Sequence, residues 1–232
     1  MEILTAYVRN DSANDSYSKD ISLDVQAILT VIKRRKYSYR YGEADRLNFK
    51  GTGLHLAKLS GANLNGAELS EANLSGADLS GAKLSDANLI GAELSGANLK
   101  AANLFGAYLN GAYLTGANLY GAELLLAKLY YANLTRVELS WANLTGAGLS
   151  EANLTGAELL GANLTGAGLT EANLTGAELS GADLTEARLG RTKNLTIYQL
   201  STVKTLYRAE LDEELLIPLK EKYPALFEKP DN

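Results

Sequence analysis

A leucine recurs at every fifth position through the middle of this chain. It occupies residue 54 and each fifth residue after it up to residue 189, which makes 28 consecutive occurrences. Phe49 holds the preceding position of the series. Alanine fills the position two before each leucine from residue 57 to residue 187, except at Val137. A fixed period of this kind indicates a repeat architecture, in which each unit stacks on its neighbours to build a continuous core.

A period of five residues fits neither a long helix nor a long strand. Five residues advance an α-helix by about 500°, so successive leucines would step around it by about 140° and leave no apolar stripe. In a strand, residues five apart alternate between the two faces. The remaining solution is a chain that turns one corner per unit, so that every leucine points to a common axis. Successive coils then stack about 4.8 Å apart through main-chain hydrogen bonds.

The other positions of the unit agree with this geometry. Alanine suits an inward position with little room. The residue before leucine is usually polar, and we expect it to face outward because polar groups cannot fill an unpartnered core. Glycine two residues after leucine suits a turn with positive φ. Glu71, Glu151 and Glu171 occupy this same position, so some corners must accept a side chain.

These units resemble the A(D/N)LXX motif of the pentapeptide-repeat family over roughly residues 48–190. The resemblance implies an all-β solenoid, a right-handed quadrilateral β-helix with four units, or about 20 residues, per coil. Counted with Phe49, the 29 units would make about seven coils and a rod of roughly 34 Å. We divide the chain into residues 1–47, a helical cap and loop, residues 48–191, the β-helix, and residues 192–232, a second helical cap.

Caps are expected because an open solenoid end exposes apolar surface and unpaired main-chain groups. In the N-terminal flank, Val25, Ile28, Leu29 and Ile32 have the spacing of an amphipathic helix. The basic run at residues 33–36 follows where the helix dipole favours cations. Nucleic-acid binding is the other interpretation of this run, but the first 48 residues carry a net charge of only +1. Direct nucleic-acid binding is therefore not expected.

In the C-terminal flank the five-residue register breaks, because leucine stands at residue 195 instead of 194. Thr196 and Gln199 have the spacing of a capping box, which predicts a helix from there to about Tyr207. A second helical stretch is predicted from Asp212, with Pro218 expected to kink or split it. With both ends capped, we expect a monomer.

Composition excludes several classes of function. The chain has no cysteine and one histidine, His55, so disulfides, thiolate metal sites and Cys/His zinc clusters are excluded. Catalysis needs groups that converge in a concave site, and a rod filled with leucine and alanine offers none. We therefore predict no enzyme activity, no catalytic, cofactor-binding or metal-binding residues and no small-molecule substrate.

The sequence also bears on location. It has no run of 18 apolar residues, so no membrane span is expected. The N-terminal segment lacks a basic stretch followed by an apolar one, and we therefore predict the cytoplasm. The flanks "DVQAILTVIKRR" and "KEKYPALF" resemble segments beside pentapeptide repeats in bacterial proteins. The start, "MEILTAYVR", resembles the middle of longer members with upstream membrane helices, which predicts a short member or a fragment of one.

Stacking of every fourth unit would align acidic residues in columns. One column would hold Glu138, Glu158 and Glu178, and the other Glu151, Glu171 and Arg191. Like charges at the spacing of neighbouring coils repel by about 1 kcal/mol per pair in water-like surroundings. A cation site is one interpretation. We favour a solvated column of flexible side chains, because hard cations need several converging oxygens.

The regular residue pattern of the repeat is interrupted between residues 104 and 141. Large apolar side chains replace Asn, Gly, Ser or Thr at nine positions: Phe105, Tyr108, Tyr113, Tyr120, Leu125, Leu126, Tyr130, Tyr131 and Trp141. If the inward pattern holds, these side chains point outward and form an aromatic belt over about two coils, a feature typical of partner-binding surfaces. The alternative is that stacked aromatics stabilise the coils, or that a flanking segment covers them.

We therefore predict a non-enzymatic scaffold that presents a rigid surface for protein–protein interaction, with an unknown protein as partner. The alternative is imitation of DNA toward a DNA-processing enzyme, as in family members that protect DNA gyrase from quinolones. Residues 54–191 carry 13 acidic and seven basic side chains, a net charge of −6 spread among many neutral residues. The axis uses leucine where those proteins often use phenylalanine, and the C-terminal helices would obstruct their mode of dimerisation.

Overall fold

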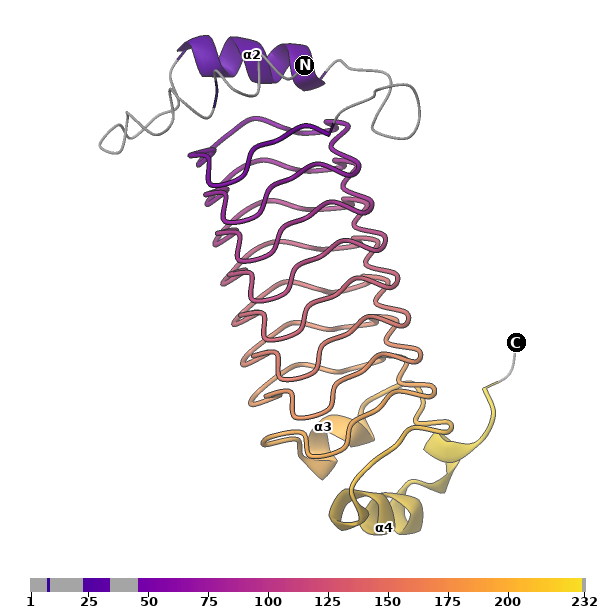
Figure 1. The fold of residues 1–232 in the computed structure, drawn as a ribbon. Coiled ribbons are helices and arrows are strands. Elements are labelled where there is room, and N and C mark those ends of the chain that lie inside the picture. Colours follow the sequence, from indigo (N-terminus) through magenta and orange to yellow (C-terminus); the bar gives the residue numbers. More distant parts are fainter. Residues whose placement is uncertain (1–7, 9–22, 34–45, 231–232) are drawn as a thin grey trace.

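The structure, a computed structural model, describes residue 8 and residues 23–33 and 46–230. These residues form an elongated rod of stacked coils with helices at both ends (Figure 1). The helices are α2 (Leu23–Lys33), α3 (Ile197–Ser201) and α4 (Glu213–Lys222), followed by the 3-10 helix η1 (Pro224–Phe227). The solenoid predicted from the leucine period is confirmed.

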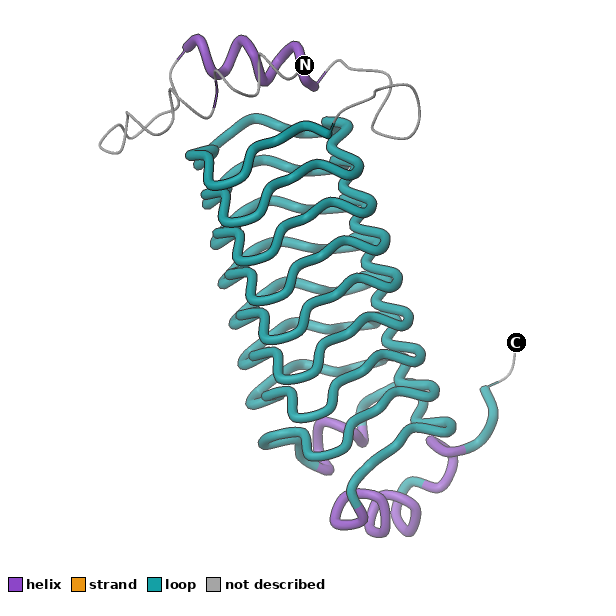
Figure 2. The backbone as a smooth tube through the Cα atoms, in the orientation of Figure 1, coloured by secondary structure: helices purple, strands orange, loops and turns teal. Residues whose placement is uncertain are grey.

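Parallel bridges join the residue before each core leucine to its counterpart four units later. The first four bridges start at residues 48, 53, 58 and 63, and each series then continues along the rod at the same spacing. The chain therefore returns to the same side after four units, and each coil has four sides. The bridges are isolated, and the described part of the chain contains no extended strand (Figure 2). The expected β pairing is therefore present as single parallel bridges and not as extended strands: each side is too short for a strand, because one bridging residue stands between two corners.

Main-chain hydrogen bonds tie each unit to the coil above it. The Leu59 amide donates to the Asp78 carbonyl at 2.7 Å, and the Asp78 amide donates back to the Ala57 carbonyl at 2.8 Å. At the corner, the Gly61 amide donates to the Ser80 carbonyl at 2.8 Å. The same three bonds recur in units along the rod. Backbone groups on the sides are thus satisfied within the main chain, and some corner amides donate to side chains, as that of Thr155 does to Asn153 Oδ1.

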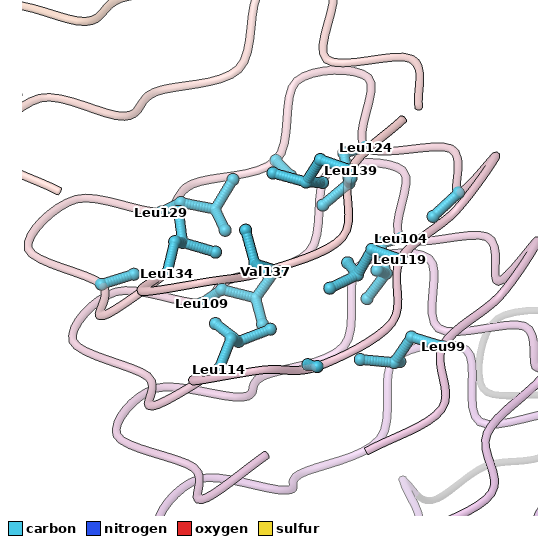
Figure 3. Close-up of a cluster of buried hydrophobic side chains, with 14 of the residues drawn as sticks. Leu99, Leu104, Leu109, Leu114, Leu119, Leu124, Leu129, Leu134, Val137 and Leu139 are labelled. Atoms are coloured by element: carbon cyan, nitrogen blue, oxygen red, sulfur yellow. The ribbon is translucent and has the colours of Figure 1, made fainter. Parts of the chain in front are cut away.

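Leucine and alanine fill the axis of the rod. The leucines at every fifth position from residue 54 to residue 189 are at most 2% exposed, and Val137 is fully buried in the alanine row. Figure 3 shows leucines of successive units, among them Leu114 and Leu134, pointing toward one another around Val137. Burial of one leucine per unit supplies most of the apolar area removed from water.

Every corner from residue 51 to residue 191 has one residue with positive φ, between 53° and 66°. Glycine holds 17 of these 29 positions, and other residues, including Trp141, hold 12. The turn itself is closed by a bond such as that from the Ala62 amide to the Leu59 carbonyl, 2.9 Å. A left-handed third residue is what a type II β-turn also requires. Both expectations for this position, positive φ and tolerance of a side chain, are confirmed.

Helix α2 lies across the N-terminal end of the rod (Figure 1). It buries Val25, Leu29 and Ile32 fully, and Ile28 packs against the same core. These are the four residues whose spacing indicates an amphipathic helix. Most of the basic run, residues 34–36, lies outside the described residues.

At the C-terminal end the capping box is present. The Thr196 hydroxyl accepts from the Gln199 amide at 3.2 Å, and the Thr196 amide donates to the Gln199 side chain at 3.0 Å. Helix α3 ends at Ser201, well before the predicted Tyr207. It ends there because the chain resumes the ladder: Asp183 bridges Thr205, two positions beyond the partner that the regular spacing would give. The bridges therefore continue beyond residue 191, into the segment assigned to the C-terminal cap.

Helix α4 follows Asp212, as expected, and passes through Pro218 without interruption. The expected split does not occur. The amide that proline lacks would have bonded to the carbonyl of Glu214, an exposed residue of the first turn. Leu219 is fully buried and anchors the helix. None of the helices in the described part of the chain is long and apolar enough to cross a lipid bilayer.

Candidate functional site

The four bridge series define four sides of the rod, which we number 1 to 4 from their first residues, 48, 53, 58 and 63. A corner of two residues separates each side from the next. Equivalent residues four units apart therefore lie in one column, on neighbouring coils. Two of the nine candidate residues can therefore lie together only if they share a column or stand in neighbouring columns.

Seven of the nine candidates gather on and around side 1. Phe105, Leu125 and Leu126 lie at the corner between sides 4 and 1, Tyr108 on side 1, Tyr130 and Tyr131 at the corner between sides 1 and 2, and Tyr113 on side 2. Leu125 is half-buried and the other six are exposed, Tyr131 at 65%. Ile90 is also exposed, at the same corner as Tyr130. We call these eight residues the side 1 surface.

The remaining two candidates, Tyr120 and Trp141, lie at the corner between sides 3 and 4, which is diagonally opposite the corner of Tyr130. Leu160 is exposed in the same column as Tyr120. We call Tyr120, Trp141 and Leu160 the Trp141 corner. Polar residues of side 4, among them Glu123, separate it from Phe105. The candidates therefore point outward, as expected, but they form two surfaces and not one belt.

Sequence reasoning missed Ile90 and Leu160. Both stand directly after a core leucine, where serine or threonine is usual in this chain. The signal that could have found them is this departure, together with their columns. Ile90 shares the column of Tyr130, two coils before it, and Leu160 shares the column of Tyr120, two coils after it.

Some of these side chains pack against glycine on the next coil. The Trp141 ring lies over Gly161, and Leu126 lies over Gly146. A Cβ added to Gly161 would come within 2.7 Å of the indole, and one added to Gly146 within 2.9 Å of Leu126. Tyr130 covers Gly148 in the same way. Stabilisation of the coils by stacked rings is therefore part of what these residues do.

Other rings make polar contacts. The Lys128 ammonium lies 4.5 Å from the centroid of the Tyr108 ring, and the Lys100 ammonium lies 5.2 Å from that of Tyr120, both cation–π contacts between neighbouring coils. A hydrogen bond with the Glu151 carboxylate, followed by the charge of that group, raises the pKa of Tyr131. The side 1 surface thus combines apolar area with phenol groups and one ammonium.

The acidic column of side 3 shows mutual repulsion. The pKa of Glu158 is raised, first by a hydrogen bond shared with Glu138 and then by its charge. Burial by itself would raise the pKa of Glu138, but hydrogen bonds from Ser140 outweigh it and hold that pKa below its usual value. The Ser140 amide donates to Glu138 Oε1 at 2.8 Å. A carboxyl group whose pKa is raised by its neighbour is the electrostatic signature of carboxylates stacked one coil apart.

The second acidic column contains its own cation. The Arg191 guanidinium lies 2.9 Å from the Glu171 carboxylate. Among the residues that the structure describes, no group of three or more His, Cys, Asp or Glu side chains is placed to hold a metal ion. The acidic side chains form rows along the rod instead of converging on one point.

The outward asparagines are occupied within their own units. In the Asn153–Thr155 unit, the asparagine Oδ1 accepts from the threonine amide at 3.1 Å and from its hydroxyl at 2.6 Å. The same pair of bonds is made at Asn133, Asn143, Asn163 and Asn173. These Asx turns stiffen the corners.

Comparison with protein families gives a match to the pentapeptide repeats, in eight copies, at residues 54–89, 82–121, 97–136, 132–170 and 152–193. Comparison with proteins of curated function gives no match. Comparison with solved structures gives several matches. The three described next have TM-scores of 0.40 or lower.

Rfr23, a pentapeptide repeat protein from the cyanobacterium Cyanothece 51142, is 38% identical over 46% of this chain, with a TM-score of 0.35; this chain spans 60% of its length. HetL, a pentapeptide repeat protein involved in heterocyst differentiation regulation from Nostoc sp. strain PCC 7120, is 32% identical over 63% of this chain and 86% of its own, with a TM-score of 0.26. QnrB1, a plasmid-mediated fluoroquinolone resistance protein, is 22% identical over 83% of this chain and 92% of its own, with a TM-score of 0.40.

Proposed function

Because the chain belongs to the pentapeptide-repeat family, we propose that it is a non-enzymatic scaffold whose side 1 surface binds a protein partner. One observation carries the proposal: eight large apolar side chains gather on one flank of a rod whose other outward positions are mostly polar. Apolar area that stays exposed on a folded protein often marks an interaction site. Tyrosine is also enriched among the residues that dominate binding energy.

Packing within the rod does not account for the whole surface. Tyr130 and Leu126 cover glycines and have a structural role. Tyr131 and Tyr113 are followed one coil further on by Glu151 and Asn133, which are not glycines. Most of the Tyr131 ring therefore remains in contact with water, which favours a partner as its final neighbour.

Imitation of DNA is the second candidate. The observation that favours it is the row Glu138, Glu158 and Glu178 on side 3, which presents repeated negative charge along the rod. The neighbouring residues of the same row, Asn98 and Asn118, are neutral, so the charged stretch covers only part of side 3. We therefore place this candidate second. Imitation of DNA requires a partner that added DNA displaces from the rod. The side 1 proposal requires a partner that stays bound when DNA is added.

We further propose that the terminal helices cap the rod and keep it from stacking end to end. At the C-terminal end, the Gln199 side-chain amide donates to the carbonyls of Leu174 and Ala177, 2.9 Å each, in place of a further coil. At the other end, α2 provides the apolar cover. With 29 corners and four sides, the rod has about seven coils between these caps. Removal of residues 192–232 should produce aggregates in light scattering; a stable monomer would contradict the C-terminal cap.

The side 1 proposal is tested by capture of partners from an extract of the native host. The test variant carries Tyr108→Ser, Tyr113→Ser and Tyr131→Ser, which leave the glycine-covering residues intact. The control is Tyr198→Ser, which removes an exposed ring from the C-terminal end of the rod, away from both surfaces. We expect wild type and control to retain the same protein and the test variant to lose it, with unchanged melting of the rod. Equal retention by all three would refute the proposal.

Duplex DNA added to the same extract separates the two candidate functions. A partner bound through the side 1 surface should remain bound in the presence of DNA. Loss of the partner on addition of DNA, together with full retention by the side 1 variant, would favour imitation of DNA instead.

A further inference from the structure

The Trp141 corner is a second surface with a different chemistry. Trp141 is the single tryptophan of the chain, and 60% of its side chain is exposed. One face of the indole lies on Gly161, so the other face is available. Tyr120 and Leu160 extend the apolar strip to the coils on either side. Trp141 also has a φ of 60°, which is disfavoured for a bulky side chain.

Carboxylates flank this strip on both sides. Glu138 and Glu158 lie on side 3, directly before the corner, and Glu123 lies on side 4, directly after it. The Ser140 amide, adjacent in sequence to Trp141, holds the Glu138 carboxylate at 2.8 Å. Of the ion pairs formed between described residues, none includes any of these three glutamates.

The charge balance separates this corner from the side 1 surface. Side 1 carries Lys128 and Arg188 on its bridge series, and its neighbouring acidic column is paired with Arg191. At the Trp141 corner the nearest lysine in the column, Lys100, lies beyond Tyr120 and is engaged with that ring at 5.2 Å. The exposed indole therefore stands among carboxylates that form no ion pair within the described part of the rod.

We propose that the Trp141 corner binds an arginine-bearing segment of a protein, with a guanidinium stacked on the free face of the indole and its neighbouring basic groups on Glu138 and Glu158. Arginine combines stacking on aromatic faces with bidentate pairing to carboxylates, so it matches both parts of the corner. This surface is distinct from side 1 and does not depend on the function proposed for it.

Other ligands fit less well. A metal ion needs converging oxygens, and here the carboxylates form a row. Nucleic acids and anionic lipid surfaces would be repelled by the same row. A purely apolar partner would leave Glu138 and Glu158 facing an uncharged surface, which carries a desolvation cost. A cationic segment satisfies the ring and the carboxylates together.

Because the chain has one tryptophan, its fluorescence reports on this corner directly. Hexa-arginine is titrated into the full chain at low ionic strength, with hexa-lysine as the comparison peptide. We expect hexa-arginine to change the Trp141 emission in a saturable way and to bind at least fivefold more tightly than hexa-lysine. Equal affinity for the two peptides would overturn the proposal, because only net charge would then be recognised.

Two double variants with the same change in net charge complete the test. Glu138→Gln with Glu158→Gln should weaken hexa-arginine binding at least tenfold. Asp86→Asn with Glu93→Gln removes two carboxylates from other columns and should change it less than twofold. Equal weakening by both would show general attraction to an acidic protein and refute the site.

The ring itself is tested by Trp141→Gly, with binding measured by calorimetry since the fluorophore is lost. Glycine fits the positive φ of this corner, so the rod should remain folded while affinity falls at least fivefold. Unchanged affinity would overturn the proposal. Capture of a partner through the side 1 surface is measured separately with the tyrosine variants, so the failure of one proposal is distinguishable from failure of the other.

Discussion

The indole ring of Trp141 lies directly over Gly161, the residue that occupies its own column one coil further along the rod. Both residues have positive φ, 60° and 62°. Leu126 and Gly146 repeat this relationship, as do Leu56 and Gly76. These three large corner residues are thus accommodated because glycine follows each of them on the next coil. The two positions form one packing unit.

This pairing predicts a difference between two glycine substitutions. Gly161→Ala and Gly81→Ala both place a side chain at positive φ, but a Cβ at Gly81 meets nothing within 4 Å. At Gly161 it meets the indole, so Gly161→Ala should cost about 1–3 kcal/mol more than Gly81→Ala in urea denaturation. Adding Trp141→Gly should remove that excess. An excess that persists without the ring would show that Trp141 is not its cause.

The axial position of leucine predicts the effect of a buried charge. Leu119 is fully buried, and Leu119→Lys places an ammonium without a partner at the axis. We expect a loss of more than about 4 kcal/mol, or no cooperative unfolding transition at all. Asn118→Lys, at the adjacent exposed position, should leave the melting temperature nearly unchanged. A cooperative transition near that of wild type for Leu119→Lys would contradict the axial assignment.

The side chain of Gln199 predicts how much the C-terminal end depends on its hydrogen bonds. Gln199→Met keeps the length of the side chain but removes the donor to the carbonyls of Leu174 and Ala177 and the acceptor of the Thr196 amide. The free energy of unfolding should fall by about 1–3 kcal/mol. Tyr198→Ala is the control, since this neighbouring side chain is 80% exposed and should matter little. Equal effects of the two substitutions would argue against a special role of Gln199.

The carboxylate pair of side 3 predicts a dependence of stability on pH. The raised pKa of Glu158, caused first by its hydrogen bond with Glu138, means that the folded rod favours the protonated form. Once charged, Glu158 opposes folding, so stability from this group is present below about pH 4 and is lost as pH rises through the raised pKa. Glu158→Gln should therefore stabilise the rod at pH 7 and have little effect at pH 3.

The size of this effect is small because Glu158 is exposed to solvent, and we expect about a few tenths of a kcal/mol. The control is the same substitution in a Glu138→Gln background, where the partner charge is gone. There the difference between pH 7 and pH 3 should disappear. Persistence of the difference in that background would assign it to another group.

Much of the fold follows from local pattern. Two side chains in five, those of the leucine and the alanine, face the axis, so the burial of Leu119 and its counterparts is predictable without knowledge of the number of sides. The length of α3 is not, because the chain returns to the ladder where Thr205 meets Asp183, a partner outside the regular spacing. No local signal near Tyr207 contains that information.

For the candidate surfaces, too, the local pattern predicts one part of the structure and not the other. The outward direction of Tyr131 and Trp141 follows from their place in the unit. Their separation onto opposite corners follows only when every fourth unit is compared: Tyr131 shares a column with Glu151, and Trp141 shares one with Gly161. The pKa of Tyr131 likewise depends on this neighbour from the next coil.

Bridged positions such as Lys58 and Asp78 stand four units apart, so the direction in which a residue faces depends on the place of its unit in a cycle of four. Insertion of one unit between Leu114 and Leu119 would turn everything downstream by a quarter of a circle, so that Trp141 would face a different direction relative to Tyr108. Insertion of four units would lengthen the rod by one coil and leave both directions unchanged. Gains and losses of single units can therefore re-aim one binding surface against another without altering a single residue of either.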